Sequence, residues 1–198
     1  MDEEKILTEK ESLALITSMI NKAKCDYEET GISALLWGII ITFCSLISFS
    51  NNYWWDLSWV NYVWFLTLLA IVPQIIISIR ESKRKKYKSY HDDAMGGIWI
   101  SFGVGIMLLS FYTGVFHTNN DVTLYLILYG IPTFATGFAR KFAPMIIGGI
   151  ASWIFAVISM YIPFPFALLL SAATAQLAWF IPGLILRRRY LKLKNDNV

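Results

Sequence analysis

Long apolar stretches separated by short polar ones dominate the pattern of this chain. Six uncharged apolar segments of about 18 to 23 residues recur, and at about 1.5 Å rise per residue each can cross a hydrocarbon core about 30 Å thick. They are Ile32 to Phe49, Leu57 to Ile79, Gly96 to Phe116, Val122 to Ala139, Met145 to Ile162 and Phe166 to Leu186. The pattern predicts an all-α integral membrane protein with six transmembrane helices.

Residues 1–31 follow a different pattern. Thr8 followed by Glu11 is a capping box, which is typical of a helix start, and apolar residues then recur at helical spacing. This apolar stripe consists of Leu13, Ile16, Ile20, Ala23 and Tyr27. Residues 1–31 hold eight acids against four lysines, unlike the basic helices that lie on anionic membranes. We therefore expect a cytoplasmic amphipathic helix that docks on protein, either on this protein's own cytoplasmic loops or on a separate cytosolic partner.

The composition agrees with a membrane protein. The chain is 56% hydrophobic and 16% charged, outside the usual range of a soluble domain. The first thirty residues are polar and acidic, so we expect no cleavable signal peptide and a first span that acts as its own insertion signal. The two cysteines, Cys25 and Cys44, lie in the soluble segment and inside the first span, which makes a structural disulfide between them improbable.

Positive charge is confined to alternate loops. All 17 Lys and Arg residues lie before the first span, in Arg80 to Lys88, at Arg140 and Lys141, or in Arg187 to Lys194. The three opposite loops hold none, so the positive-inside rule places both termini in the cytoplasm. The predicted organisation is a cytoplasmic helix (1–31), a six-span bundle (32–187) and a cytoplasmic tail (188–198).

The loop after the second span is the most basic stretch of the chain. Its cations are Arg80, Lys83, Arg84, Lys85, Lys86 and Lys88. Between two spans such a cluster is a topology determinant that touches anionic lipid headgroups, and it is also a candidate dock for the acidic amino-terminal helix. We expect membrane lipid and a cytosolic protein as partners, and no nucleic acid; the sequence gives no oligomeric state.

The six spans contain an internal repeat. The even spans each hold a proline followed five to eight residues later by an arginine, at Pro73, Pro132 and Pro182. The odd spans carry small residues at i, i+4 and i+8: Ala34, Gly38, Thr42; Gly97, Ser101, Gly105; Gly148, Ser152, Ala156. We interpret the spans as three tandem helical hairpins, in which the small residues let odd helices pack closely at the centre and the prolines are candidate hinges.

Candidate chemistry is sparse. The spans contain no Asp, Glu, Lys, Arg or His, the groups from which ion pathways and proton relays are built. Gln74 and Gln176 are the most polar intramembrane side chains, and each bonds either a neighbouring helix or a substrate. The cluster His91, Asp92 and Asp93 either binds a metal or serves acid-base chemistry, or its acids favour the start of a helix through the dipole. We predict no catalytic, cofactor or metal site.

The segment KESLALITSMINKAK, the six spans, the basic loop after the second span and the segments IPTF and IPG resemble a group of small bacterial inner-membrane proteins. The resemblance implies a location in the bacterial inner membrane and this architecture, and it specifies no chemistry. The leading hypothesis is a non-enzymatic regulatory, sensing or scaffold protein. The alternatives are a small transporter or permease subunit for a neutral or apolar solute, and an enzyme acting on lipid.

Overall fold

The computed structural model describes residues 13, 30–55, 57–84, 90–116 and 121–195, with the backbone alone for residues 90–92. All regular structure in those ranges is helical, which confirms the predicted all-α class. The long helices are α2 (Ile32–Ser50), α3 (Phe65–Arg84), α4 (Tyr90–Phe116), α5 (Asp121–Ala139), α6 (Ala143–Ser159), α7 (Phe164–Ala175) and α8 (Ile181–Asn195). Three short ones join or extend them: η1 (Asn51–Trp55), η2 (Ser58–Trp64) and η3 (Gln176–Phe180).

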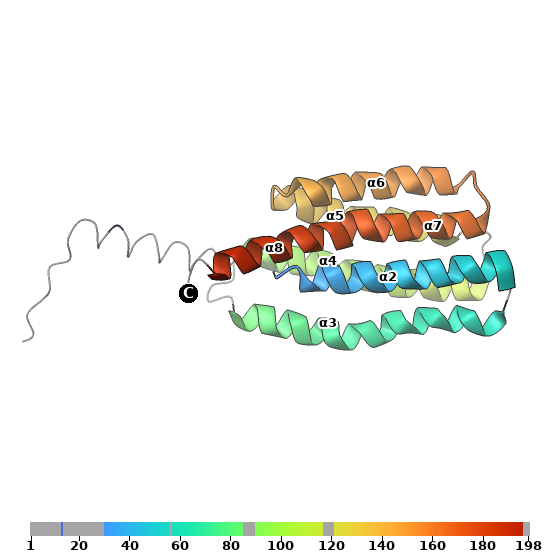
Figure 1. Cartoon of the computed structure of the whole chain (residues 1–198), viewed down its shortest axis with the longest axis horizontal. Coiled ribbons are helices and arrows are strands. Elements are labelled where there is room, and N and C mark those ends of the chain that lie inside the picture. Colours follow the sequence, from blue (N-terminus) through green and yellow to red (C-terminus); the bar gives the residue numbers. More distant parts are fainter. Residues whose placement is uncertain (1–12, 14–29, 56, 85–89, 117–120, 196–198) are drawn as a thin grey trace, which may run out of the picture.

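The helices lie side by side along the long axis of the molecule and form one bundle (Figure 1). Helices α7, η3 and α8 follow one another without a break over Phe164–Asn195. Five helical segments are long and apolar enough to cross a membrane: Ile32–Trp55, Ser58–Arg84, Asp93–Phe116, Asp121–Ala139 and Phe164–Asn195. The described chain is therefore compatible with a membrane protein.

The fifth predicted span differs from the other five. It was expected over Met145 to Ile162, but α6 ends at Ser159 after 17 residues. The chain turns at Met160, and Pro163 then precedes α7. Proline fixes its own φ and disfavours helical backbone in the residue before it, so the helix ends earlier than the run of apolar residues does.

The centre of the bundle is built from α2, α5, α6 and the α7–η3 segment. The most extensive contact between two described helices joins α5 to α6, and α2 packs mainly on α7 and η3. Glycines make these approaches close: a Cβ on Gly137 would lie 2.6 Å from the backbone nitrogen of Ile146, and one on Gly149 would lie 2.8 Å from Cβ of Phe134. Small residues are the usual means of close helix packing in lipid, where burying apolar surface gives little drive for association.

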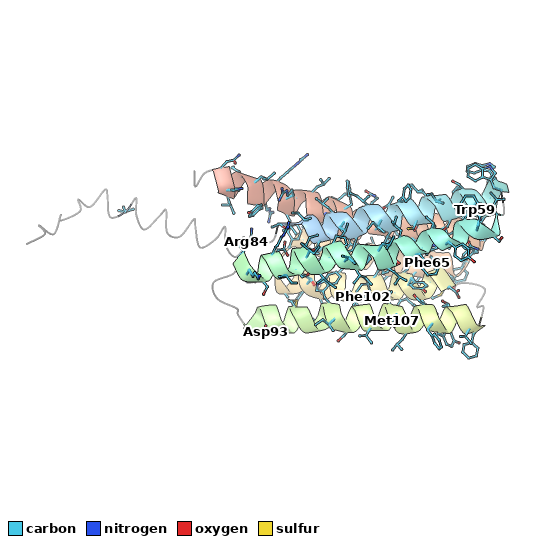
Figure 2. All side chains as sticks on the ribbon, turned by 90° about the horizontal axis from the view of Figure 1, so that it is seen from below. Trp59, Phe65, Arg84, Asp93, Phe102 and Met107 are labelled. Atoms are coloured by element: carbon cyan, nitrogen blue, oxygen red, sulfur yellow. The ribbon has the colours of Figure 1, made fainter. Side chains whose placement is uncertain are left out.

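Helices α3 and α4 lie at the edge of this centre. In the apolar part of each, 6% of the residues are buried, and Leu69, Ile100, Met107 and Phe111 are all at least two-thirds exposed. Figure 2 shows both helices on one side of the bundle, with Phe65 and Met107 on their exposed lengths. Extended apolar surface of this kind marks contact with a membrane or another protein.

Polar groups fix the turns at both ends of the bundle. At one end, the side-chain amide of Asn51 donates to the carbonyl of Leu57 (3.1 Å) and its oxygen accepts from the Leu57 backbone N–H (2.9 Å). At the other end, Lys141 adopts a left-handed backbone with φ 52, and Phe142 N–H donates to Gly137 O (2.8 Å). The second pattern is a Schellman motif, which ends α5 and directs Phe142 back toward the bundle.

Candidate functional site

The described cations gather at one end of the bundle. Its cations are Arg80, Lys83, Arg84, Arg140, Lys141, Arg187, Arg188, Arg189, Lys192 and Lys194. Figure 2 places Arg84 and Asp93 at this end and Trp59 at the opposite one. The opposite end is rich in exposed aromatic side chains, among them Trp54, Trp55 and Tyr161. We name the first end the basic end and treat it as the candidate functional site.

The start of α2 is attached to two other helices at the basic end. The Thr30 hydroxyl donates to the Glu81 carboxylate of α3, and the Thr30 backbone N–H lies 3.4 Å from the same oxygen. Gly31 has φ 71, and a Cβ there would lie 2.9 Å from the Arg187 nitrogen of α8 and even closer to the Gly183 carbonyl. The chain that precedes the bundle therefore enters it between α3 and α8.

Aromatic rings hold three of the arginines. Arg84 of α3 and Arg187 of α8 lie near the same ring, with their Cζ atoms 4.7 Å and 5.7 Å from the Tyr190 centroid. Arg189 lies over Phe142, at 5.2 Å. A guanidinium over an aromatic face is attracted by the ring quadrupole. These contacts order side chains that would otherwise sample many rotamers.

The basic-loop candidates divide into two groups. Arg80 and Lys83 are exposed on α3, and Arg84 is half-buried. Lys85, Lys86 and Lys88 lie outside the described residues. Reasoning from the sequence missed Tyr190 and Gly183; the signals were an aromatic residue within a run of cations and a glycine directly after Pro182.

The interior of the bundle is crossed by hydrogen bonds between uncharged groups. They join Ser45 to Ser171 (3.2 Å), Thr123 to Ser159 (2.7 Å), Ser152 to the Leu126 carbonyl (2.7 Å) and the Trp99 indole to Thr136 (3.1 Å). The described Asp, Glu, Lys, Arg and His residues instead lie in the first or last turns of helices, between helices, or in α8 from Arg187 onward. The polar contacts inside the described spans therefore link helices without placing charge there.

Both glutamines singled out from the sequence bond neighbouring helices. Gln74 of α3 accepts from the Trp37 indole (3.0 Å) and donates to Ser33 and Ser78 (3.1 Å each). Gln176 of η3 donates to the Thr42 hydroxyl of α2 (2.7 Å). The structure thus places both in helix-to-helix contacts, the first of the two roles considered from the sequence.

Thr133 is the most testable of these polar contacts. It is fully buried, accepts from the Trp179 indole (3.0 Å) and donates to Tyr129 O (2.7 Å). Replacing it with valine keeps the shape but leaves the buried indole N–H without its acceptor. We expect Thr133→Val to destabilise the bundle by about 1 to 2 kcal/mol. Thr133→Ser keeps the hydroxyl and is the control. Equal unfolding midpoints for wild type and Thr133→Val in detergent would contradict this reading.

Four of the candidate packing residues lie at helix contacts. A Cβ on Gly38 would be 2.8 Å from Phe180 N, and one on Gly148 would be 2.5 Å from Ala178 Cα. Helices α2 and α6 therefore both press on η3. Ser152 and Ala156 are buried on the same helix as Gly148.

The third predicted span does not follow the expectation that its small residues pack at the centre of the bundle. Around Gly97 there is nothing within 4 Å of an added Cβ, and around Gly105 the one near atom is Leu128 Cδ2 at 3.9 Å. Ser101 is exposed. The reason is that α4 turns a different face to the bundle, formed by Trp99, Phe102 and Ile106. Helices α2 and α6, which correspond to the first and fifth predicted spans, turn their small residues to the centre. The small residues of α4, the third predicted span, lie outside it.

The three candidate hinge prolines are not equivalent. Pro73 is exposed on α3, whereas Pro132 and Pro182 are fully buried. The π-helical turn η3 ends two residues before Pro182, and such turns often accompany a proline that cannot donate to the helix. Movement at Pro132 or Pro182 would require repacking of the buried surface around it.

His91, Asp92 and Asp93 lie in the first turn of α4. Asp93 is exposed, and the side chains of His91 and Asp92 lie outside what the structure describes. Over the described residues, no three His, Cys, Asp or Glu side chains gather as a metal site would require. The predicted amphipathic helix also lies outside the described residues, apart from Leu13, Thr30 and Gly31.

Comparison of the chain with protein-family models, with curated proteins and with solved structures found no match. Fold and function therefore rest on the geometry above. It defines an all-helical bundle with membrane-length apolar helices, a basic end and an aromatic end.

Proposed function

We propose that this chain is a multi-pass protein of the bacterial inner membrane that crosses the bilayer six times, with both termini in the cytoplasm. The observation that supports this most directly is the separation of charge: the described cations lie at one end and exposed aromatic side chains at the other. Lys and Arg prefer the cytoplasmic side, and Trp and Tyr gather at membrane interfaces. The basic end is then the cytoplasmic face.

The sixth crossing in this proposal is α6. Its 17 residues span about 25 Å at the α-helical rise, and a short span is accommodated by local thinning of the bilayer at modest cost. Ile147, Ile154 and Val157 on its outer face are more than half exposed, as expected of side chains in contact with lipid.

The proposal includes three tandem hairpins, formed by α2 with α3, α4 with α5, and α6 with α7 to α8. In each of the first two hairpins, a tryptophan of the first helix donates a hydrogen bond to a side chain 37 residues later in the second helix. These pairs are Trp37 with Gln74 and Trp99 with Thr136. Ser48 of α2 and Ser110 of α4 also accept hydrogen bonds from the segment that follows in the chain, Ser48 from Trp64 of η2 and Ser110 from Tyr125 of α5. The shared offset supports a common origin of the first two copies.

For activity, we propose a regulatory, sensing or scaffold role rather than transport. Neutral hydrogen bonds and backbone contacts at Gly38 and Gly148 join α2 and α6 to the α7–η3 segment in the described interior. The preceding chain joins the bundle at the basic end, between Glu81 and Gly183. A cytosolic partner held by the amino-terminal helix would therefore sit against the cationic surface.

The test removes the apolar stripe of that helix and keeps the chain length. Leu13, Ile16 and Ile20 are replaced by serine in the full-length protein, and cross-linked cytosolic partners are compared with those of the wild type. The matched control is Glu11→Gln, Ser18→Ala and Lys22→Gln, three changes off the stripe. We expect a specific partner to disappear from the first variant alone. An identical set of partners in all three proteins would count against the regulatory role.

A further inference from the structure

Helix α8 continues past the start of α2 and carries an exposed surface at the basic end. Gly31 packs against Gly183 and Arg187 of α8. From Arg187 the helix runs on for eight residues to Asn195, which is about 12 Å at the helical rise. Figure 1 shows this part of α8 reaching beyond the start of α2. Leu191, one turn after Arg187, is 41% exposed there.

Leu191 lies between two cations on the same side of α8. Arg188 and Lys194 are three residues before and three residues after it, so each is its neighbour on the helix surface. Both are exposed. Lys192 is also exposed, but it does not share a face with Lys194, because residues two apart on a helix do not face each other. We name Arg188, Leu191 and Lys194 the α8 surface.

The chain that precedes the bundle carries the complementary pattern. Tyr27 belongs to the predicted apolar stripe, and Asp26 and Glu28 are its neighbours in sequence. On a helix these two acids lie on either side of Tyr27, about 100° from it, whereas Glu29 lies off that face. An apolar contact bordered by opposite charges is the arrangement by which paired helices select their partners.

The position of Thr30 brings the two patterns within reach of each other. Thr30 is held by Glu81, and Gly31 packs on α8. The four residues from Asp26 to Thr30 span at most about 14 Å when fully extended. The left-handed backbone of Gly31, with φ 71, is typical of a residue that ends a helix. A tether this short gives an effective concentration in the millimolar range, so modest contacts suffice for docking.

We propose that residues 20–29 dock on the α8 surface of their own chain. In the docked state Tyr27 packs on Leu191, and the two acids beside Tyr27 pair with the two cations beside Leu191. Docking covers the part of the apolar stripe nearest the bundle and leaves Leu13 and Ile16 for the cytosolic partner of the proposed function. The contact lies within one chain and does not require that partner.

Zero-length carbodiimide coupling tests the contact in the purified full-length protein in detergent. The reagent joins a carboxylate to a lysine amine only where the two groups touch, and mass spectrometry identifies the pairs. We expect Lys194 to couple to Asp26 or Glu28, with little product at the off-face residues Lys192 and Glu29. In 1 M salt the yield should fall by about threefold, the size of an exposed ion-pair effect. Absence of the Lys194 product, or equal coupling at Lys192, would overturn the proposal.

A spin label on Cys25 gives a second measurement that does not depend on coupling. Cys44 is fully buried, so the label attaches at Cys25, which is two residues from Tyr27 and off the predicted stripe. Leu191→Ser and Lys194→Gln should each increase the mobility of the label, because each removes part of the α8 surface. The matched control Lys192→Gln removes the same charge from the other side of α8. Equal mobility in all of these proteins would contradict docking.

The acidic residues have a matched control within the same segment. Asp26→Asn with Glu28→Gln should abolish the Lys194 product and release the label. Glu3→Gln with Glu4→Gln removes the same charge far from Thr30 and should leave both measurements unchanged. If both double variants release the label equally, only overall charge matters and the specific contact is wrong.

Isotope mixing distinguishes docking within one chain from contact with a second copy. Protein labelled with ¹⁵N is mixed with unlabelled protein before coupling, and we expect each coupled pair to carry a single isotope. Mixed pairs would assign the α8 surface to a second copy and overturn docking within one chain. Because the purified protein contains no cytosolic partner, failure of docking leaves the proposed function to be judged by its own experiment, and loss of the partner leaves the docking result unaffected.

Discussion

Replacing Gly148 with alanine is expected to destabilise the bundle by about 2 to 3 kcal/mol, near the upper end of ordinary overpacking costs. The added methyl carbon would lie 2.5 Å from Ala178 Cα and 2.6 Å from Leu177 O. Both are backbone atoms of the same helical path, so no flexible side chain can give way. Either α6 separates from the α7–η3 segment or the π-helical turn rearranges, and the contacts around Ser152 weaken with it.

The matched control for this prediction is Gly97→Ala. The two glycines hold equivalent places in the predicted repeat, yet nothing lies within 4 Å of an added Cβ at Gly97. Alanine is the better helix former by about 0.5 to 1 kcal/mol, so Gly97→Ala should be neutral or slightly stabilising. Unfolding by increasing SDS in mixed micelles measures both variants. Equal midpoints for the two variants would show that the α6 contact with η3 is absent.

Gly31→Ala is expected to lower stability by about 2 kcal/mol or more, for two separate reasons. The left-handed backbone at φ 71 costs a non-glycine residue roughly 1 to 2 kcal/mol. In addition, an added Cβ would press on the Arg187 nitrogen at 2.9 Å, which moves the start of α2 away from α8. The attachment of the preceding chain to the basic end should loosen with this displacement.

Two comparisons separate the causes at Gly31. Asparagine tolerates the left-handed region but still brings a Cβ, so Gly31→Asn should recover part of the loss. Gly183→Ala brings a Cβ to 3.0 Å from Leu35 N with an ordinary backbone conformation and should cost less than Gly31→Ala. Limited proteolysis near residue 30, together with SDS unfolding, reports both attachment and stability. Wild-type behaviour of Gly31→Ala in both assays would refute the close contact with α8.

Much of the helical framework could be predicted from hydrophobic length alone. Runs of about twenty apolar residues must satisfy their own backbone hydrogen bonds, so α2 and α5 lie close to their predicted ranges. The second predicted span is divided between η2 (Ser58–Trp64) and α3 (Phe65–Arg84), and α4 begins at Tyr90, six residues before the predicted start of the third span. Local turn chemistry was harder to predict. The end of α6 at Ser159 depends on the turn before Pro163, and apolar residues continue through both.

The faces that the helices turn to one another could not be predicted in this way. Gly97 and Gly148 have the same local pattern of small residues, but only Gly148 meets a neighbouring backbone. Small residues permit close approach without specifying a partner. For α4, the large side chains Trp99 and Phe102 decide the inward face instead, through contacts with Thr136, Tyr129 and Trp179.

The positive charge of the candidate site could be predicted from the sequence, but the arrangement of its side chains could not. The run of basic residues identified the end of α3 as a contact for lipid or protein, and Arg84 lies there. The participation of Arg187 and Tyr190 depends on how α3 and α8 pack, over a separation of about one hundred residues in sequence. Only the folded structure brings these groups together.

The membrane topology is the claim on which the proposed function depends. Fusions of green fluorescent protein and alkaline phosphatase after Val198 test it directly, with truncated fusions after Trp55, in the first proposed outer turn, as the reference. The account predicts fluorescence and no phosphatase activity at Val198, with the opposite result at Trp55. Phosphatase activity after Val198 would place the basic end outside the cytoplasm and contradict the account.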